Sequence, residues 1–277
     1  MNNIPTLLCS FVSLFLLFSW PLQGGEHGED LSALENIFSA FSATGTMQIN
    51  DLRPNRQSEW IHDRQRASTR FSPASTYKIP HTLFALQAGI IDNEFQIFTW
   101  DGVARDFPGW NQNQTLLSSL RYSVVWVYQQ IARQLGKERT KEYLQAIAYG
   151  NADPDPNQES YWLEGNLAIS ASEQIHFLQR LYYNDLPFAL AHQRLVKDLL
   201  LLEAGKEWRL RGKTGWSGTI GWWVGWVERL DGPIFFALNI DTPQRLADLP
   251  KREALGRRVL CLLQALPAAA CPPAMEK

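Results

Sequence analysis

The stretch PASTYKIPHTLFALQAG, residues 73–89, decides how the rest of the sequence is interpreted. Apolar residues recur there at helical spacing, which predicts a helix that begins near Ser75 and ends at Gly89. Proline is tolerated inside a helix only near its start, so Pro80 requires the helix to begin shortly before it. Ser75 and Lys78 are therefore expected in the first turn.

Ser75 and Lys78 form an S-x-x-K motif, in which residues three apart share one face of a helix. A serine hydroxyl is a weak nucleophile until a neighbouring base takes its proton. A lysine amine can be that base where burial lowers its pKa, and a helix N-terminus stabilises developing negative charge. The motif is short enough to recur by chance, so alone it indicates catalysis only weakly.

Two further short motifs follow along the chain. Lys213 opens a K-T-G motif on a predicted strand, where lysine and threonine can bind a carboxylate and glycine permits close approach of a substrate. Ser123 opens the string S-V-V in a helix-rich stretch. A serine within a helix more often bonds its own backbone than it relays a proton. Taken alone, each of these motifs is also only weak evidence of a catalytic site.

The remaining pattern predicts an α+β fold. Strands are expected at both ends of the chain and helices in the middle, without the strand–helix alternation of a parallel sheet. We expect an antiparallel sheet flanked by helices, a helical lobe over roughly residues 90–205 inserted between the two sheet-forming ends, and a site in the cleft between the lobes. The expected strands are residues 45–51, 59–62, 208–216, 221–230 and 234–241, and the expected helices are 31–41, 75–89, 116–135, 137–148, 172–184, 191–202 and 252–265.

Composition excludes several classes of function. The 277 residues carry a formal net charge of −2 and no block of lysine or arginine, so nucleic acid is not an expected partner. The five histidines are scattered along the chain, which argues against a zinc site, and no metal is expected. The string G-x-S-x-G does not occur, which excludes hydrolases built on that motif.

The N-terminal segment of the chain indicates export. An uncharged apolar run at residues 6–22, followed by small and polar residues, predicts a signal peptide over residues 1–24. A retained membrane anchor is the alternative, although the run is short for a span. We expect residues 25–277 to form one periplasmic or secreted catalytic domain with no stable membrane partner. Export permits a disulfide between Cys261 and Cys271, but the spacing leaves a disulfide and two free thiols equally open.

Taken jointly, the motifs resemble the class D β-lactamases, the oxacillinase-type members of the penicillin-recognising serine enzymes. The resemblance runs from about residue 71 to the C-terminal helix, and the motifs agree in order and spacing. It implies hydrolysis of small-molecule β-lactam antibiotics through a serine acyl-enzyme, and so resistance to them. The matching stretches are PASTYK at 73–78, WDG at 100–102, SVVWVYQ at 123–129, YGN at 149–151, YWLEG with L-x-IS at 161–170, GKTGW at 212–216, GWWVGWVE at 221–228, NID at 239–241 and LPKR at 249–252.

The resemblance implies catalytic roles for four residues. Ser75 would be acylated. Lys78 would carry a carboxyl group taken from carbon dioxide and act as the general base in acylation and deacylation. Only a neutral amine reacts with carbon dioxide, which suits an apolar pocket. Trp162 would donate its indole N–H to the resulting carbamate, and Ser123 would pass protons. No separate cofactor is implied.

The resemblance also implies which residues surround the substrate: Lys213, Thr214, Gly215, Trp216, Arg252, Val125 and Leu163. The side chains of the first two and of Arg252 would bind the substrate carboxylate. The backbone N–H groups of Ser75 and Trp216 would form the oxyanion hole. Val125 and Leu163 would form walls of the lysine pocket.

Alternatives remain within the same superfamily. A penicillin-binding sensor domain shares these motifs but is acylated without turnover, and a cell-wall transpeptidase is the third candidate. Class A enzymes carry S-D-N where this chain has S-V-V. Only SGTIG lies between Trp216 and Trp222, which is shorter than in many relatives and leaves the substrate spectrum open. Monomer and homodimer are both compatible with the sequence.

Overall fold

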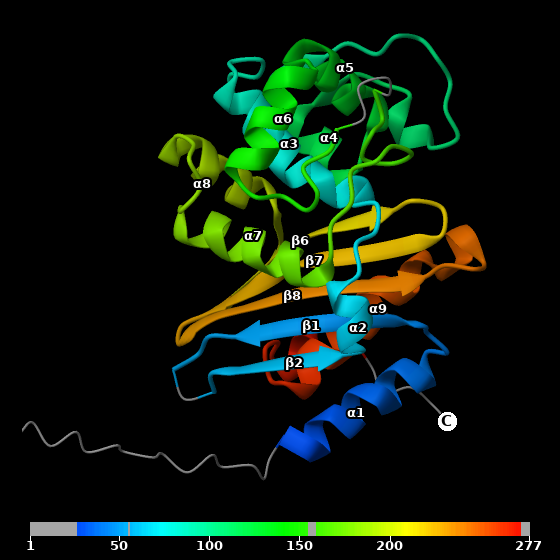
Figure 1. The fold of residues 1–277 in the computed structure, drawn as a ribbon, viewed down its shortest axis with the longest axis vertical. Coiled ribbons are helices and arrows are strands. Elements are labelled where there is room, and N and C mark those ends of the chain that lie inside the picture. Colours follow the sequence, from blue (N-terminus) through cyan, green and yellow to red (C-terminus); the bar gives the residue numbers. More distant parts are fainter. Residues whose placement is uncertain (1–26, 55, 155–158, 273–277) are drawn as a thin grey trace, which may run out of the picture.

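The computed structural model describes residues 27–54, 56–154 and 159–272, and the predicted signal peptide lies outside these ranges. A sheet forms one half of the molecule and a helical lobe lies above it (Figure 1). The strands are β1 Gly45–Asp51, β2 Ser58–His62, β3 Ile97–Phe98, β4 Gln114–Thr115, β5 Leu201–Ala204, β6 Trp208–Trp216, β7 Ile220–Arg229 and β8 Gly232–Asp241. The α-helices are α1 His27–Ala40, α2 Arg64–Ser68, α3 Lys78–Gln87, α4 Leu116–Arg121, α5 Val125–Leu135, α6 Lys137–Ala146, α7 Ala171–Tyr183, α8 Leu190–Leu199 and α9 Leu249–Leu262. Short 3-10 helices are η1 Ala74–Tyr77, η2 Pro108–Trp110, η3 Arg245–Asp248 and η4 Ala268–Ala270.

The predicted α+β fold with an antiparallel sheet is confirmed. The strand order is β2-β1-β8-β7-β6-β5, and each neighbouring pair is antiparallel. Strands β1 and β2 come from the N-terminal part of the chain, whereas β5 to β8 come from its C-terminal part. The two parts join where β1 pairs with β8, with Met47 opposite Leu238.

Strand β7 shows why this part of the sequence is apolar almost without interruption. Trp222 and Trp226 pack in the core that the sheet shares with α7 and the helical lobe, whereas Trp223 packs in the core beneath α1 and α9. All three indoles are fully buried. Alternate side chains of a strand point to opposite faces, so a strand covered on both faces needs an apolar residue at nearly every position.

The helical lobe differs from the sequence-based expectation at two places. The helix expected over residues 116–135 is divided into α4 and α5, because Ser123 adopts a left-handed φ of 57° that a helix cannot accommodate. The helix expected over residues 191–202 ends at Leu199. Leu201 instead begins the edge strand β5, where pairing with β6 supplies backbone hydrogen bonds that sequence periodicity does not reveal.

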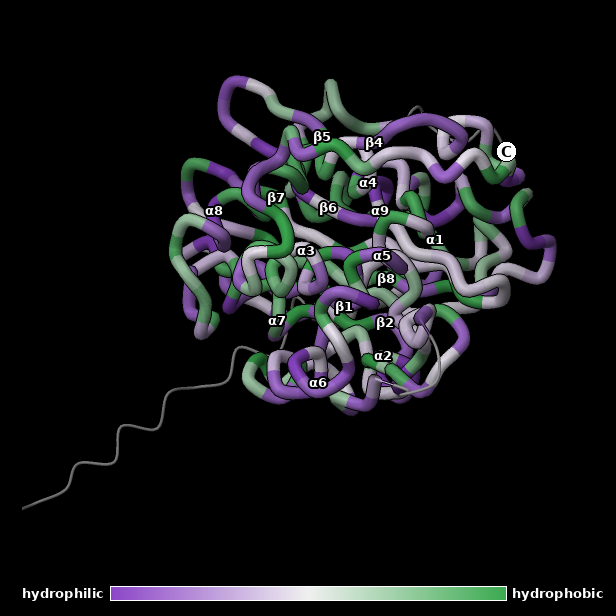
Figure 2. The backbone as a smooth tube through the Cα atoms, turned by 90° about the horizontal axis from the view of Figure 1, so that it is seen from above, coloured by the Kyte–Doolittle hydropathy of each residue, from purple (hydrophilic) through white to green (hydrophobic). Residues whose placement is uncertain are grey.

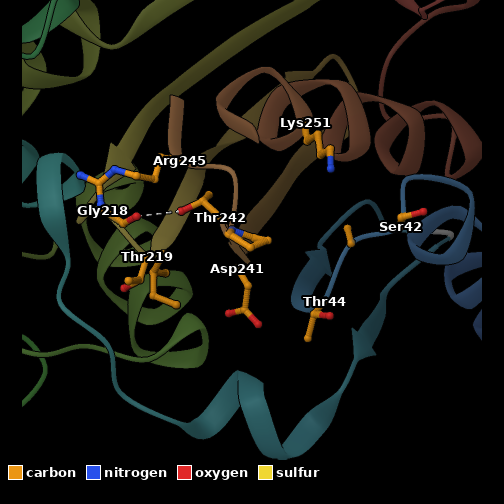
Figure 3. Close-up of a pocket in the computed structure, with 11 residues that line it drawn as sticks. Ser42, Thr44, Gly218, Thr219, Asp241, Thr242, Arg245 and Lys251 are labelled. Atoms are coloured by element: carbon orange, nitrogen blue, oxygen red, sulfur yellow. Dashed lines mark hydrogen bonds between the residues drawn. The ribbon is translucent and has the colours of Figure 1, made fainter. Parts of the chain in front are cut away.

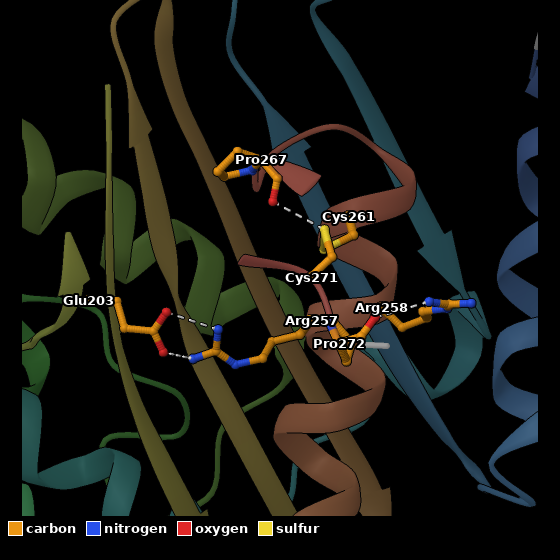
Figure 4. The surroundings of a disulfide bond; sticks show 7 residues. All are labelled: Glu203, Arg257, Arg258, Cys261, Pro267, Cys271 and Pro272. Carbon is orange, nitrogen blue, oxygen red and sulfur yellow. Dashed lines mark hydrogen bonds and ion pairs between the residues drawn. A yellow bond between two sulfur atoms is a disulfide. The ribbon is translucent and has the colours of Figure 1, made fainter. Parts of the chain in front are cut away.

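A disulfide joins Cys261 and Cys271, the outcome that the sequence left open (Figure 4). It ties the end of α9 to the segment that follows it. On the same helix, Arg257 forms an ion pair with Glu203 of β5, which holds α9 against the edge of the sheet. A covalent bond and an ion pair therefore both anchor the C-terminal helix α9.

Short hydrophobic and hydrophilic stretches alternate along the backbone when the molecule is seen from above (Figure 2). This is the pattern expected of helices and strands that bury one side and are joined by polar loops. Among the helices that the structure describes, none combines the length and the apolar character needed to cross a bilayer.

Candidate active site

The nucleophile candidate lies where the 3-10 helix η1 leads into α3. Lys78, the first residue of α3, donates a hydrogen bond from Nζ to Ser75 Oγ at 3.0 Å. Ala74 directly before the serine has a φ of 48°, a strained value for a residue with a Cβ. Its N–H donates to the carbonyl of Trp162 at 3.0 Å. The segment around Trp162 therefore holds the turn that presents Ser75.

Lys78 is fully buried among aromatic side chains. Its Nζ lies 5.0 Å from the ring centroid of Tyr128 and 5.8 Å from that of Trp162. Burial lowers the pKa of Lys78 well below its ordinary value, and the charge of Lys213 lowers it further. The neutral amine is the form that can accept the proton of Ser75, and it is also the form that reacts with carbon dioxide.

Buried nitrogen atoms beside Lys78 have no hydrogen-bond partner among the described residues. They are Nε1 of Trp162 and both ring nitrogens of His81, one turn further along α3. Burial lowers the pKa of His81 to about 3, with a contribution from Lys78, so the imidazole is neutral and carries one N–H. Unpaired donors in a dry site favour an additional acceptor, and a carboxyl group on Lys78 would supply oxygen atoms there.

The opposite wall of the site is cationic. On strand β6, Lys213 donates from Nζ to Ser123 Oγ at 2.5 Å and to the carbonyl of Thr214 at 2.9 Å. Burial lowers the pKa of Lys213 to about 7, and the neighbouring charge of Arg252 contributes. Ser123 thus links the helical lobe to the sheet, and the turn between α4 and α5 places its hydroxyl at the ammonium group.

Two further contacts position strand β6, one against the turn that carries Ser75 and one against α9. A Cβ at Gly215 would lie 3.1 Å from the carbonyl oxygen of Pro73 and 3.2 Å from the amide nitrogen of Thr76, so only glycine fits without displacement. From α9, Arg252 donates through Nη1 to the carbonyl of Gly215 at 2.6 Å and through Nε to that of Leu249 at 2.8 Å. Burial lowers the pKa of Arg252 to about 10.

A cleft of about 360 Å³ lies between these walls. Its lining includes eight residues predicted from the sequence: Ser75, Ser123, Val125, Leu163, Thr214, Gly215, Trp216 and Arg252. Lys78 and Trp162 are fully buried behind this surface, and Lys213 is almost so. The structure therefore brings all the predicted site residues to one place.

Other residues of the cleft were missed by sequence reasoning. They are Phe107, Trp110, Tyr122, Glu164, Ser217, Gly218, Arg245 and Leu249. Most come from loops; Glu164 and Leu249 lie in the motifs YWLEG and LPKR but were given no role, and no short motif marks the others. For His81, the available signal was its position three residues after Lys78, on the same face of one helix. In the part of the chain that the structure describes, no three His, Cys, Asp or Glu side chains are grouped as ligands for a metal ion.

Comparisons with known proteins identify the family. The family model of the penicillin binding protein transpeptidase domain matches residues 43–260. A class D β-lactamase structure from Nostoc superposes with a TM-score of 0.81 at 40% identity, over 84% of this chain and 99% of that one. The chain belongs to the class D β-lactamases. A class D β-lactamase from Fusobacterium nucleatum also has a TM-score of 0.81, at 36% identity over 85% of this chain and 99% of that one.

Among curated proteins, this chain is similar to OXA β-lactamases from several bacteria. It is 56% identical to β-lactamase OXA-20 of Pseudomonas aeruginosa over 230 residues, 83% of this chain and 86% of the relative. It is 53% identical to β-lactamase OXA-2 of Salmonella typhimurium over 261 residues, 93% and 94% of the two chains. The residues matched by the family model, 43–260, include every residue that lines the cleft, so both walls of the site lie within the shared domain.

Proposed function

We propose that this class D β-lactamase opens the β-lactam ring with Ser75 as nucleophile, and that Lys78, carboxylated on Nζ, is the general base in both acylation and deacylation. Turnover of β-lactams in this way would confer resistance to them. The observation that carries the proposal is the 3.0 Å hydrogen bond between Ser75 and a fully buried Lys78 at the floor of the cleft. A base whose charged form is disfavoured can take a hydroxyl proton near neutral pH.

Acylation follows from the position of the groups. The Ser75 proton passes to the base at Lys78 while Oγ attacks the lactam carbonyl carbon. The backbone N–H groups of Ser75 and Trp216, both in the cleft lining, would stabilise the oxyanion. When the lactam C–N bond breaks, the nitrogen needs a proton. Ser123, hydrogen-bonded to the Lys213 ammonium, is the hydroxyl that would deliver it.

The substrate carboxylate suits the wall formed by β6 and α9. Lys213, Thr214 and Arg252 would bind it, because all three offer donors beside the nucleophile and the lysine and arginine also carry positive charge. Binding of an anion there also raises the pKa of Lys213, which keeps its ammonium protonated near neutral pH. Val125 and Leu163 would form apolar walls of the cleft beside Lys78.

The carboxyl group on Lys78, when present, supplies a carboxylate-like base that activates water to hydrolyse the acyl-enzyme. The residues around Lys78 fit such a group, because the buried indole N–H of Trp162 has no acceptor in the described part of the chain. Trp162 would hold the group in place by that hydrogen bond. Loss of this hydrogen bond would shift Lys78 towards the unmodified amine, and the acyl-enzyme would then not be hydrolysed.

The test is hydrolysis of benzylpenicillin by the purified mature protein, followed by ring absorbance with and without added bicarbonate. We expect sustained turnover that increases with bicarbonate. One stoichiometric burst that stops, with bicarbonate present, would instead identify a penicillin-binding sensor that stays acylated. Turnover that is unchanged when bicarbonate is removed and restored would contradict a carboxylated Lys78.

We also propose that residues 1–24 direct export and that the mature enzyme acts in the periplasm. The apolar run at residues 6–22 and the disulfide between Cys261 and Cys271 support this location. The N-terminal sequence of the protein isolated from the periplasmic fraction tests the proposal. Enzyme found only in membranes, with residue 1 retained, would favour the anchor.

A further inference from the structure

A second pocket adjoins the active-site cleft. It measures about 470 Å³ and lies between the β6–β7 turn, the segment before β1 and the segment after β8 (Figure 3). Gly218 and Arg245 line both the pocket and the cleft. Figure 3 shows Arg245 beside Gly218, with Ser42 and Thr44 across the pocket. Arg245 is thus the side chain at the junction of the two spaces.

The charge of Arg245 is unmatched by any carboxylate among the described residues. Within the described residues, its guanidinium donates no hydrogen bond and has no carboxylate within ion-pair distance; it stacks 5.4 Å from the ring centroid of Trp216. The other charged side chains of the second pocket are paired: Lys251 with Asp248 at 2.9 Å, and Asp241 with Arg66 at 2.6 Å.

The segment that carries Arg245 is held rigidly against Trp216. The indole Nε1 of Trp216 donates to Oγ1 of Thr242 at 3.1 Å, and the N–H of Thr242 donates to the carbonyl of Thr219 at 2.8 Å. Arg245 itself has a left-handed φ of 54°, which is strained for a residue with a Cβ. Such strain persists where surrounding contacts determine the conformation, and it often marks a binding site. The backbone that carries Arg245 is therefore fixed before any ligand binds, and the guanidinium lies over the Trp216 ring.

The direction of the bound substrate follows from strand β6, and here the inference rests on the proposed function. The ring carboxylate is assigned to Lys213 and Thr214, and the lactam carbonyl to the N–H of Trp216. In a β-lactam, the carbonyl lies between the ring that bears the carboxylate and the carbon that bears the acylamino side chain. Continuing along β6 beyond Trp216, the side chain is directed towards Gly218 and Arg245.

We propose that Arg245 binds an anionic group on the acylamino side chain of the substrate, and that the second pocket takes the end of that side chain. The enzyme then favours β-lactams with a second carboxylate in the side chain. A planar guanidinium is suited to a carboxylate because it can donate two parallel hydrogen bonds. Glu164, which also lines the cleft, is the acid that would disfavour an anion elsewhere along it.

The experiment compares three penicillins that share one aromatic side chain: benzylpenicillin, its α-amino analogue and its α-carboxy analogue. The quantity measured is the ratio of kcat/KM for the α-carboxy compound to that for the α-amino compound. We expect Arg245→Gln to lower this ratio about three- to fivefold, mainly through KM for the α-carboxy compound, because an exposed ion pair contributes to binding before the chemical step. Arg245→Glu should lower the ratio further, and Arg245→Lys should lower it least.

Arg209→Gln is the matched control, because Arg209 is likewise an exposed arginine but lies on β6, at the end of the strand far from Trp216. The control should leave the ratio unchanged, and added salt should reduce the effect of Arg245→Gln. A ratio that stays within twofold in both Arg245→Gln and Arg245→Glu, or that falls equally in Arg209→Gln, overturns the role of Arg245. Absence of benzylpenicillin turnover in the unmodified enzyme would instead overturn the proposed function on which this inference rests.

Discussion

Each of the two walls of the cleft contains a buried lysine, but the surroundings of the two lysines differ. Lys78 lies among aromatic rings, and its Nζ donates a hydrogen bond to the hydroxyl of Ser75. Lys213 donates to a hydroxyl and to a backbone carbonyl, and lies beside Arg252. The surroundings therefore favour a neutral base on the helix side and a cation that titrates near neutral pH on the strand side. Residue type alone does not distinguish these roles.

The largest expected effect comes from removing the nucleophile on the helix side. Ser75→Ala should abolish covalent labelling by penicillin and lower kcat/KM by at least about 10⁴-fold, since Ser75 is the hydroxyl that the buried base at Lys78 activates. Mass spectrometry after incubation with penicillin measures the adduct. Ser68→Ala, on the exposed helix α2, is the control and should label normally. Labelling that persists in Ser75→Ala would show that another residue is acylated.

The next effect concerns the partner of Lys78. Trp162→Phe keeps the ring but removes the N–H, and should lower deacylation about 100-fold so that the acyl-enzyme accumulates. Incorporation of ¹³C-labelled bicarbonate, observed by NMR, should fall in the same variant. Trp226→Phe removes another buried indole, whose Nε1 donates to Glu228, and should leave the bicarbonate signal unchanged. Normal turnover of Trp162→Phe at low bicarbonate would contradict the assigned role.

Lys213, on the wall formed by strand β6, should determine the alkaline limb of the pH profile of kcat/KM. The pKa of Lys213 is lowered to about 7, so its ammonium is lost as pH rises through this value. In the free enzyme without bicarbonate, kcat/KM should fall about tenfold for each pH unit above that midpoint. A carboxyl group on Lys78 adds negative charge nearby, so saturating bicarbonate should raise the pKa of Lys213 and move the limb to higher pH.

Lys213→Arg provides the comparison for this prediction, because a guanidinium stays charged throughout the range. The alkaline limb should disappear in this variant, even if the overall rate is lower. A limb whose midpoint is unaffected by both bicarbonate and Lys213→Arg would mean that a different group titrates.

The smallest effect on catalysis is expected from removing the disulfide, whose cysteines do not line the cleft. The double variant Cys261→Ser, Cys271→Ser removes the disulfide between residues that are 10 apart in sequence. Loss of this constraint on the unfolded chain should lower the free energy of unfolding by about 3 kcal/mol. Chemical denaturation measures this change, with the reduced unmodified protein as control. At 25 °C, kcat/KM should remain within twofold of the unmodified value; a larger loss would couple α9, and hence Arg252, to the disulfide.

Much of the site could be predicted because its chemistry is carried by short motifs. Ser75 and Lys78 share one helix turn, so their contact follows from spacing alone. The strands β1, β6, β7 and β8 also matched prediction closely, since their alternation or apolar continuity is strong. Prediction was poorer where backbone pairing or a special φ value decided the outcome, as at Ser123 and at the edge strand β5.

By itself, the sequence determined the α+β class, the antiparallel sheet made from both chain ends, and the motifs that belong to a penicillin-recognising site. Only the tertiary structure decided that Cys261 and Cys271 are bonded, that His81 lies beside Lys78 with no partner for its ring nitrogens among the described residues, and that Arg245 lines two adjoining pockets. These features depend on which surfaces meet when distant segments pack. Local spacing governs contacts within a helix turn or a strand, whereas burial, and with it the pKa of each lysine, arises only after the two lobes have closed on each other.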